Sequence, residues 1–178
     1  ITMGDPAGIG PEITVRALNR KETYEKCRPV VTGDAAIMRQ AVKLLGFDLQ
    51  VNAVQNVKDA KFEFGTIDVL DLQCVNFATF EFGKVQSQCG NAAFQYIKKA
   101  IELAMANEVD GTVTAPLNKE ALNLAGHHYD GHTEIYATFT GTKKYAMMPA
   151  DDTIRVIHVS THVPLRKACD LVKKARVI

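Results

Sequence analysis

Three histidines lie within six positions of the segment AGHHYDGHTE, residues 125–134, in a chain that has only five histidines. Imidazole nitrogens can bind a metal, transfer a proton or hydrogen-bond an anion, so the spacing has to decide between these roles. His128 and His132 are four residues apart, which on a helix would place both on one face, as in an HExxH zinc site. Gly131 interrupts that helix, and Tyr129 stands where the glutamate is required. The spacing therefore argues against a zinc protease.

The same segment fits a turn that is followed by a helix. In this interpretation His127 and His128 are turn residues, and Gly131 admits His132 and Thr133 to the first turn of the helix. The unpaired N–H groups at the start of a helix favour anionic ligands. We therefore expect His132 and Thr133 to bind an anionic substrate.

A glycine-rich segment near the start of the chain, MGDPAGIGPEI (3–13), follows a short apolar run. Gly4, Gly8 and Gly10 allow positive φ angles and a close approach of the backbone to a ligand. Their spacing matches neither GxxxxGK[ST] nor GxGxxG, so neither phosphate-loop motif is present. A tight turn between a strand and a helix remains an alternative explanation.

Two later segments place polar residues after expected strands, where open α/β sheets bind their ligands. TAPLNK (114–119) ends in Lys119, which can bind a carboxylate or phosphate, or can simply be solvated at the start of a helix. HVSTHVPLR (158–166) contains two histidines. His158 falls within a strand pattern and fits a core or interface position, whereas His162 falls just beyond the strand, where a ligand or a catalytic residue would lie.

Short apolar runs alternate with amphipathic patterns along the chain, which is typical of an α/β fold with a largely parallel sheet. Asp34 is expected to cap a helix that ends at Gly46, and an aromatic stretch at 73–84 has no clean period. The expected strands are 30–32, 49–54, 66–72, 109–115 and 154–160, and the expected helices include 91–106, a short helix ending at Gly126, and the segment after residue 163.

The composition is that of a soluble globular protein, with 47% hydrophobic and 23% charged residues. A net charge near +1 without a basic cluster argues against nucleic-acid binding. No apolar run is long enough for a membrane helix. The four cysteines form no CxxC pair, which favours reduced thiols and a cytoplasmic location. A GxSxG motif is absent, so a serine hydrolase has no support.

Four motifs occur in an order that resembles the 4-hydroxythreonine-4-phosphate dehydrogenase family of vitamin B6 biosynthesis. These motifs are ITMGDPAGIGPEI, TAPLNKEALNLAG, GHTE and VSTHVPLR. The resemblance extends over nearly the whole chain and corresponds to the N-terminal part of a longer protein. Both ends of the chain fall within apparent secondary-structure elements, so we expect a fragment.

The resemblance implies the fold of isocitrate and isopropylmalate dehydrogenases, with two α/β/α lobes, a cleft between them, and an incomplete second lobe here. Glycine and polar residues concentrate in the histidine-rich loop, so we expect a first lobe at residues 1–128 and the start of a second lobe at 129–178. The resemblance also implies a homodimer with the active site near the interface. His132 and Thr133 correspond to substrate contacts, and His162 corresponds to one of three histidine ligands of a divalent metal (Zn, Mg or Co). The other two metal ligands would lie beyond this chain.

The implied activity is the oxidation of 4-phosphooxy-L-threonine with NAD, followed by decarboxylation, in pyridoxal 5'-phosphate biosynthesis. TAPLNKEALNLAGHHYDGHTEIYA and VIHVSTH are more similar to a sister branch that acts on D-threonate or D-erythronate 4-phosphate in sugar-acid catabolism. The motifs do not decide between these substrates. A non-catalytic lobe that binds anions is an alternative of another class.

Overall fold

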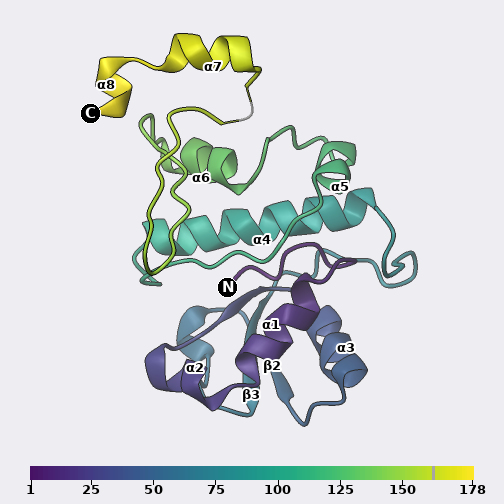
Figure 1. Ribbon diagram of the computed structural model, residues 1–178. Coiled ribbons are helices and arrows are strands. Elements are labelled where there is room, and N and C mark those ends of the chain that lie inside the picture. The colour runs from purple at the N-terminus through teal and green to yellow at the C-terminus, as the bar shows by residue number, and fades with distance from the viewer. Residues whose placement is uncertain (162) are drawn as a thin grey trace. The chain divides into compact units, whose positions relative to one another are not determined.

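The structure is a computed structural model that describes residues 1–161 and 163–178. These residues form two compact units, Ile1–Ile135 and Tyr136–Ile178. The predicted α/β class is confirmed, since the first unit contains a parallel sheet with helices beside it (Figure 1). The division into lobes at 1–128 and 129–178 is predicted for the fold of a longer protein, and it stays a prediction.

Three parallel strands form the sheet, in the spatial order β1 (Val31–Gly33), β3 (Thr66–Asp71) and β2 (Gln50–Val54). Val69 of the central strand lies opposite Val31 on one side and opposite Ala53 on the other. Five of the six residues of β3 are buried, as expected for a parallel strand that is covered on both faces. The three strands predicted between residues 30 and 72 are confirmed.

The beginning of the chain extends this arrangement beyond β1. Thr2 forms parallel bridges with both Thr32 and Thr114. Its N–H donates to the carbonyl of Val113 over 2.8 Å, and its carbonyl accepts from the N–H of Ala115 over 3.2 Å. The buried strand predicted at 109–115 is wrong, because this segment forms only one bridge and Val113 is 66% exposed.

The first unit also contains helices, the last of which continues into the second unit. They are α1 (Gly10–Leu18), α2 (Lys21–Lys26), α3 (Ala35–Leu45), the 3-10 helix η1 (Val57–Asp59), α4 (Ser87–Met105), α5 (Lys119–Leu124) and α6 (His132–Thr140). Gly46 ends α3 as predicted, with a left-handed φ of 65°. The helix expected at 91–106 begins four residues earlier, at Ser87. Helix α4 lies between β1 and α5 (Figure 1).

The start of α3 differs from the prediction in one detail. Asp34 occupies the N-cap position, but its carboxylate accepts hydrogen bonds from the N–H groups of Cys74 (2.9 Å) and Val75 (2.7 Å). Asp71, at the end of β3, accepts from the N–H of Ala35 over 2.8 Å instead. Asp34 therefore attaches the loop after β3 to the start of α3, and Asp71 accepts the hydrogen bond of an N–H group in the first turn of α3.

The core of the first unit lies between the sheet and the helices that flank it. Its buried residues come from the N-terminal segment, β1, β3, α1, α3 and α4, and include Met3, Val15, Leu18, Val31, Ile37, Met38, Ile67, Val69, Ala92 and Tyr96. The hydroxyl of Thr32 donates to the carbonyl of Tyr96 over 3.0 Å, which ties α4 to β1. Among the helices of residues 1–161 and 163–178, none has the length and apolarity to cross a membrane.

The second unit continues from α6 and ends in two short helices, α7 (Leu165–Leu171) and α8 (Lys174–Val177). The strand predicted at 154–160 is wrong for the described residues, where an isolated antiparallel bridge joins Ala150 to Arg155. A strand needs a neighbour along its length, and the backbone here pairs only at scattered points of a hairpin.

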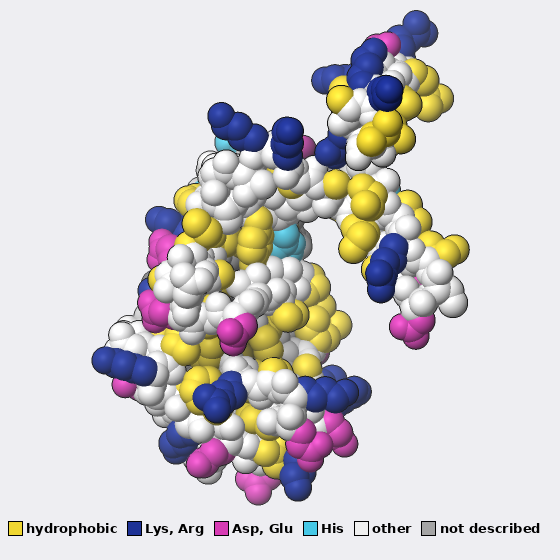
Figure 2. All heavy atoms as spheres, turned by 90° about the vertical axis from the view of Figure 1, so that its left-hand side faces the viewer, with side chains coloured by type: hydrophobic (Ala, Val, Ile, Leu, Met, Phe, Trp, Pro, Cys, Tyr) yellow, Lys and Arg dark blue, Asp and Glu magenta, His cyan; other side chains and the backbone are white. Residues whose placement is uncertain are grey.

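Arg176 fastens α8 to this hairpin. Its guanidinium donates to the carbonyls of Val159 and Tyr145, both over 3.0 Å. Apolar side chains of the unit remain on the surface, with Leu165 83% exposed and Ile157 64% exposed (Figure 2). Backbone and arginine hydrogen bonds therefore connect the hairpin and α8 of the second unit.

Candidate functional site

Two loops of the first unit lie side by side, one after Thr2 and one after Thr114. Thr2 lies between β1 and Thr114, so the segment after Thr2 and the segment after Thr114 are neighbours. The N–H of Asp5 donates to the carbonyl of Pro116 over 2.9 Å. In an open α/β sheet, ligands usually bind at the carboxyl ends of the strands, where such loops begin.

The glycines of the first loop serve mainly to allow close packing. Gly4 has a φ of 75°, and a Cβ at this position would overlap the carbonyl oxygen of Pro116. Gly8 and Gly10 do not take positive φ, so that part of the prediction is wrong. A Cβ on Gly10 would overlap the carbonyl oxygen of Met3, which brings the start of α1 against the N-terminal segment.

Asp5 stabilises the turn of this loop from within. Its Oδ1 accepts a hydrogen bond from the N–H of Ala7 over 2.9 Å, and the residue is only 6% exposed. Burial raises the pKa of the Asp5 carboxyl, and the hydrogen bond from Ala7 opposes that change. The tight-turn interpretation of the loop is thus supported, with a buried carboxyl at its centre.

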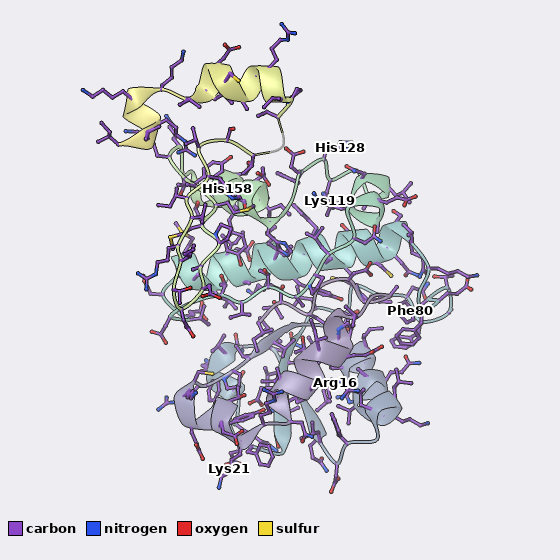
Figure 3. All side chains as sticks on the ribbon, in the orientation of Figure 1. Arg16, Lys21, Phe80, Lys119, His128 and His158 are labelled. Carbon is purple, nitrogen blue, oxygen red and sulfur yellow. The ribbon has the colours of Figure 1, made fainter. Side chains whose placement is uncertain are left out.

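The second loop leads into α5. The side chain of Asn118 caps this helix, because its Oδ1 accepts from the N–H of Ala121 over 3.0 Å. Lys119 is exposed at the first helical position (Figure 3). A Cβ on Gly90 of α4 would overlap the carbonyl of Ala121, so α4 and α5 pack with their backbones in contact. Asn118 therefore has a structural role, and Lys119 is exposed to a ligand in solution.

The histidine-rich loop joins α5 to α6 as predicted. His127 stacks on Phe94 of α4, with ring centroids 3.8 Å apart, and its Nε2 lies 3.0 Å from Oδ1 of Asn91. His128 is exposed, and its Nδ1 lies 3.1 Å from Oδ1 of Asn123 on α5 (Figure 3). The two neighbouring histidines thus bind different helices.

His132 and Thr133 begin α6, and both are half-buried. Nε2 of His132 is buried and has no hydrogen-bond partner among residues 1–161 and 163–178. Burial lowers the pKa of His132, whereas a hydrogen-bonding interaction with the backbone of Ala115 acts in the opposite direction. His132 is therefore neutral near pH 7, and it lies beside the loop that follows Thr114.

The remaining predicted residues belong to the second unit. His158 is half-buried, and its N–H donates to the carbonyl of Met147 over 3.0 Å within the hairpin. His162, the predicted metal ligand, lies outside the described residues. No group of three or more His, Cys, Asp or Glu side chains among the described residues could hold a metal ion.

A groove that the sequence did not indicate lies on the outer side of the glycine-rich loop. Ile9, Glu12 and Phe82 line it together with Gln40 and Leu44 of α3. The N–H of Gly83 donates to the carbonyl of Ala7 over 2.9 Å and so joins the aromatic loop to the glycine-rich loop. The aperiodic aromatic stretch at 73–84 was the available signal, with Phe80 and Phe82 in edge contact (Figure 3).

Comparison with known proteins shows the family of this chain. Residues 25–178 match the model of a family described as pyridoxal phosphate biosynthetic protein PdxA. The chain belongs to the PdxA family. The resemblance carried by the four sequence motifs is therefore confirmed for this PdxA-family chain.

Similar proteins are named as dehydrogenases of phosphorylated hydroxy acids. A Clostridium botulinum protein named "Putative D-threonate 4-phosphate dehydrogenase" is 45% identical over 178 residues, which are 100% of this chain and 53% of that protein. A Fusobacterium nucleatum protein of the same name is 43% identical and is covered over 54% of its length. The chain spans about half the length of the curated relatives it matches.

A solved structure extends the similarity to three dimensions. The crystal structure of a 4-hydroxythreonine-4-phosphate dehydrogenase from Burkholderia phymatum superposes with a TM-score of 0.90 and 41% identity, covering 99% of this chain and 53% of that one. The predicted fold type, that of the isocitrate and isopropylmalate dehydrogenases, is thereby confirmed.

Proposed function

We propose that this chain is part of a nicotinamide-dependent dehydrogenase that oxidises 4-phosphooxy-L-threonine with NAD, followed by decarboxylation, in pyridoxal 5'-phosphate biosynthesis. Membership of the PdxA family over residues 25–178 supports the reaction class. The observation that carries the assignment to this site is the buried Nε2 of His132, beside Thr133 at the start of α6, which has no hydrogen-bond partner in the described part of the chain.

A buried polar atom without a partner is costly unless a ligand satisfies it. Burial keeps the imidazole of His132 neutral, so it can hydrogen-bond a substrate hydroxyl or phosphate without a fixed positive charge. The hydroxyl of Thr133 and the first N–H groups of α6 can donate to an anionic oxygen. Together these groups bind and orient the substrate.

In this proposal His162 is one of three histidine ligands of a divalent metal (Zn, Mg or Co), and the other ligands come from the rest of the protein. The described residues hold no complete metal site. When bound, the metal would supply Lewis-acid stabilisation of the substrate oxygen, and NAD would accept the hydride. We further propose a cytoplasmic homodimer with the active site near its interface.

D-threonate 4-phosphate is the second candidate substrate, with D-erythronate 4-phosphate as its close analogue. The names of the Clostridium and Fusobacterium relatives favour it. These substrates carry a hydroxyl group where 4-phosphooxy-L-threonine carries an amine. His132 and Thr133 can bind either class, because both contain the same phosphate and secondary alcohol.

The test is a substrate panel on the whole protein. Reduced nicotinamide is measured with each of the three phosphates and with NAD or NADP, before and after chelation and metal restoration. Metal-dependent reduction of NAD with one phosphate is expected, and His132→Asn and Thr133→Val should raise KM by about tenfold or more. Anion binding without any reduction of NAD or NADP would favour the non-catalytic lobe instead.

The metal assignment has its own control. His162→Ala should abolish the metal-dependent activity, whereas His158→Ala, which changes a histidine of the hairpin, should retain it. Full metal-dependent activity in His162→Ala would contradict the proposed ligand.

A further inference from the structure

We propose that His127 is a positioning residue: it fastens the loop that presents His132 and Thr133 to α4 and thereby sets the affinity for the phosphorylated substrate. The attachment itself is independent of the identity of the substrate. Its effect on affinity rests on the proposed function, in which His132 and Thr133 contact that substrate.

The attachment is a stack of rings with a hydrogen bond at its edge. The His127 ring lies nearly parallel to that of Phe94, at 15° and with centroids 3.8 Å apart, and its Nε2 is 3.0 Å from Oδ1 of Asn91. Tyr129, two residues further on, also stacks on Phe94, at 5.8 Å and 20°. Phe94 is only 7% exposed, so both loop side chains rest on a buried ring.

The protonation state of His127 suits this geometry. The Asn91 oxygen can only accept, so Nε2 of His127 carries the hydrogen and donates it. Burial lowers the pKa of His127, and the neighbouring His128 lowers it further. A neutral imidazole can stack on an apolar ring without the cost of removing a full charge from water.

The position of His127 in the loop explains why its loss should affect the site. Backbone hydrogen bonds hold the two ends of the loop, from the N–H of His127 to the carbonyl of Leu122 (3.1 Å) and from the N–H of Ile135 to the carbonyl of Gly131 (3.4 Å). Between these ends, the rings of His127 and Tyr129 join the loop to α4. Without the His127 contacts, His132 and Thr133 would remain present but would be less well oriented.

The neighbouring histidine offers a matched control. His128 has the same chemistry and lies in the same loop, but it is exposed, and its ring bonds to Asn123 of α5 rather than to α4. A His128→Ala substitution therefore removes an imidazole without removing the stack.

The experiment compares variants of the whole protein by steady-state kinetics and by amide hydrogen exchange of the peptide 127–135. His127→Ala should raise KM for the phosphorylated substrate about tenfold while kcat stays within about twofold, because it removes orientation in the bound state rather than chemistry. Hydrogen exchange of the peptide should become faster. His128→Ala should change neither KM nor the rate of hydrogen exchange of this peptide.

Two further variants test the parts of the attachment. His127→Phe, which keeps an aromatic ring on Phe94 and loses the hydrogen bond, should restore part of the affinity and should fold even if His127→Ala does not. Adding Asn91→Ala to His127→Ala should have little extra effect, because both remove the same hydrogen bond. Additive effects of the two substitutions would overturn the proposed pairing.

The outcomes separate the two proposals. If the wild-type protein oxidises none of the phosphates, the proposed function fails, while the exchange measurement still tests the attachment. Unchanged exchange and unchanged KM in His127→Ala would overturn the positioning role. A fall in kcat at constant KM would overturn it too, since that result indicates direct participation in the chemistry.

Discussion

The two compact units differ sharply in how they use their apolar residues. The first unit buries side chains of β1, β3, α1, α3 and α4 in a continuous core. Among the described residues of the second unit, 136–161 and 163–178, none is buried. Yet the second unit contains apolar runs, and Ile154, Ile157 and Val172 are each more than 60% exposed.

The units also differ in charge. Residues 1–135 contain 13 Lys and Arg against 17 Asp and Glu, a net charge of −4, whereas residues 136–178 contain eight against three, a net charge of +5. The overall charge of +1 therefore conceals two parts of opposite sign. An apolar pattern predicts burial only where the same unit supplies the covering surface, as the first unit does and the second does not.

Truncation of a core isoleucine should show the contrast most strongly. Ile97 of α4 is fully buried, so Ile97→Ala should lower the free energy of unfolding by about 2–5 kcal/mol through lost burial and a cavity. Ile157→Ala, at a 64% exposed site, should change it by less than about 0.5 kcal/mol. Urea unfolding of the whole protein measures both. A large loss at Ile157 would break the contrast, because it would mean that this side chain is covered in the whole protein.

Helix contact in the first unit provides the next test. Gly90→Ala should cost about 1–3 kcal/mol, since the added methyl group meets the backbone carbonyl of Ala121, which cannot move aside without shifting α5. Gly111→Ala is the control, because nothing lies within 4 Å of a Cβ at that position. Thermal unfolding compares the two variants. Equal stability of both would show that α4 and α5 are less closely packed than described.

A capping residue gives a smaller effect that sharpens the comparison. Helix α5 of the first unit has a side-chain cap from Asn118, whereas α7 of the second unit begins after Pro164 without one. Asn118→Ala should cost about 1 kcal/mol. Asn123→Ala removes an exposed asparagine from the same helix and should cost less. The free energy of unfolding in urea should rank the variants in that order.

The smallest expected effect is a dependence of stability on pH that arises in the first unit. Burial lowers the pKa of His132 below 6.5, so folding favours its neutral form. The resulting stabilisation is present above the unfolded value of 6.5 and is lost as the pH falls through the lower, folded value. His132→Gln should therefore show a shallower loss of stability across this window. An identical pH profile in the variant would contradict the assignment.

The elements that depend on local patterns were predictable. β1, α3 and its end at Gly46 follow from adjacent residues, as do α5 and the start of α6 at His132. Contacts between distant residues were not predictable. The carboxylate of Asp34 binds N–H groups 40 and 41 residues away, and His127 stacks on α4, where its partner Asn91 is 36 residues away.

In the candidate site, too, local motifs were predictable and contacts between distant segments were not. The motif around His132 and Thr133 was visible in the sequence, and so was the glycine-rich loop, because residue type and spacing carry that information. The groove beside Phe82 was not predictable, since it forms only when the aromatic loop and α3 come together. The strand expected at 154–160 failed for a related reason: periodicity reports which residues alternate but not whether a neighbouring strand is present.

Gly90 and Phe94 lie one helical turn apart on α4, and their contacts affect how the protein responds to substitutions in this helix. Gly90 sets the position of α5, and Phe94 supports the loop that leads to His132. The other side of the same helix is tied to β1 through Thr32. A substitution along this helix would therefore be transmitted to the sheet and to the histidine loop together, so thermal stability and substrate affinity should vary jointly among α4 variants. Natural drift at these positions would have to preserve both properties at once.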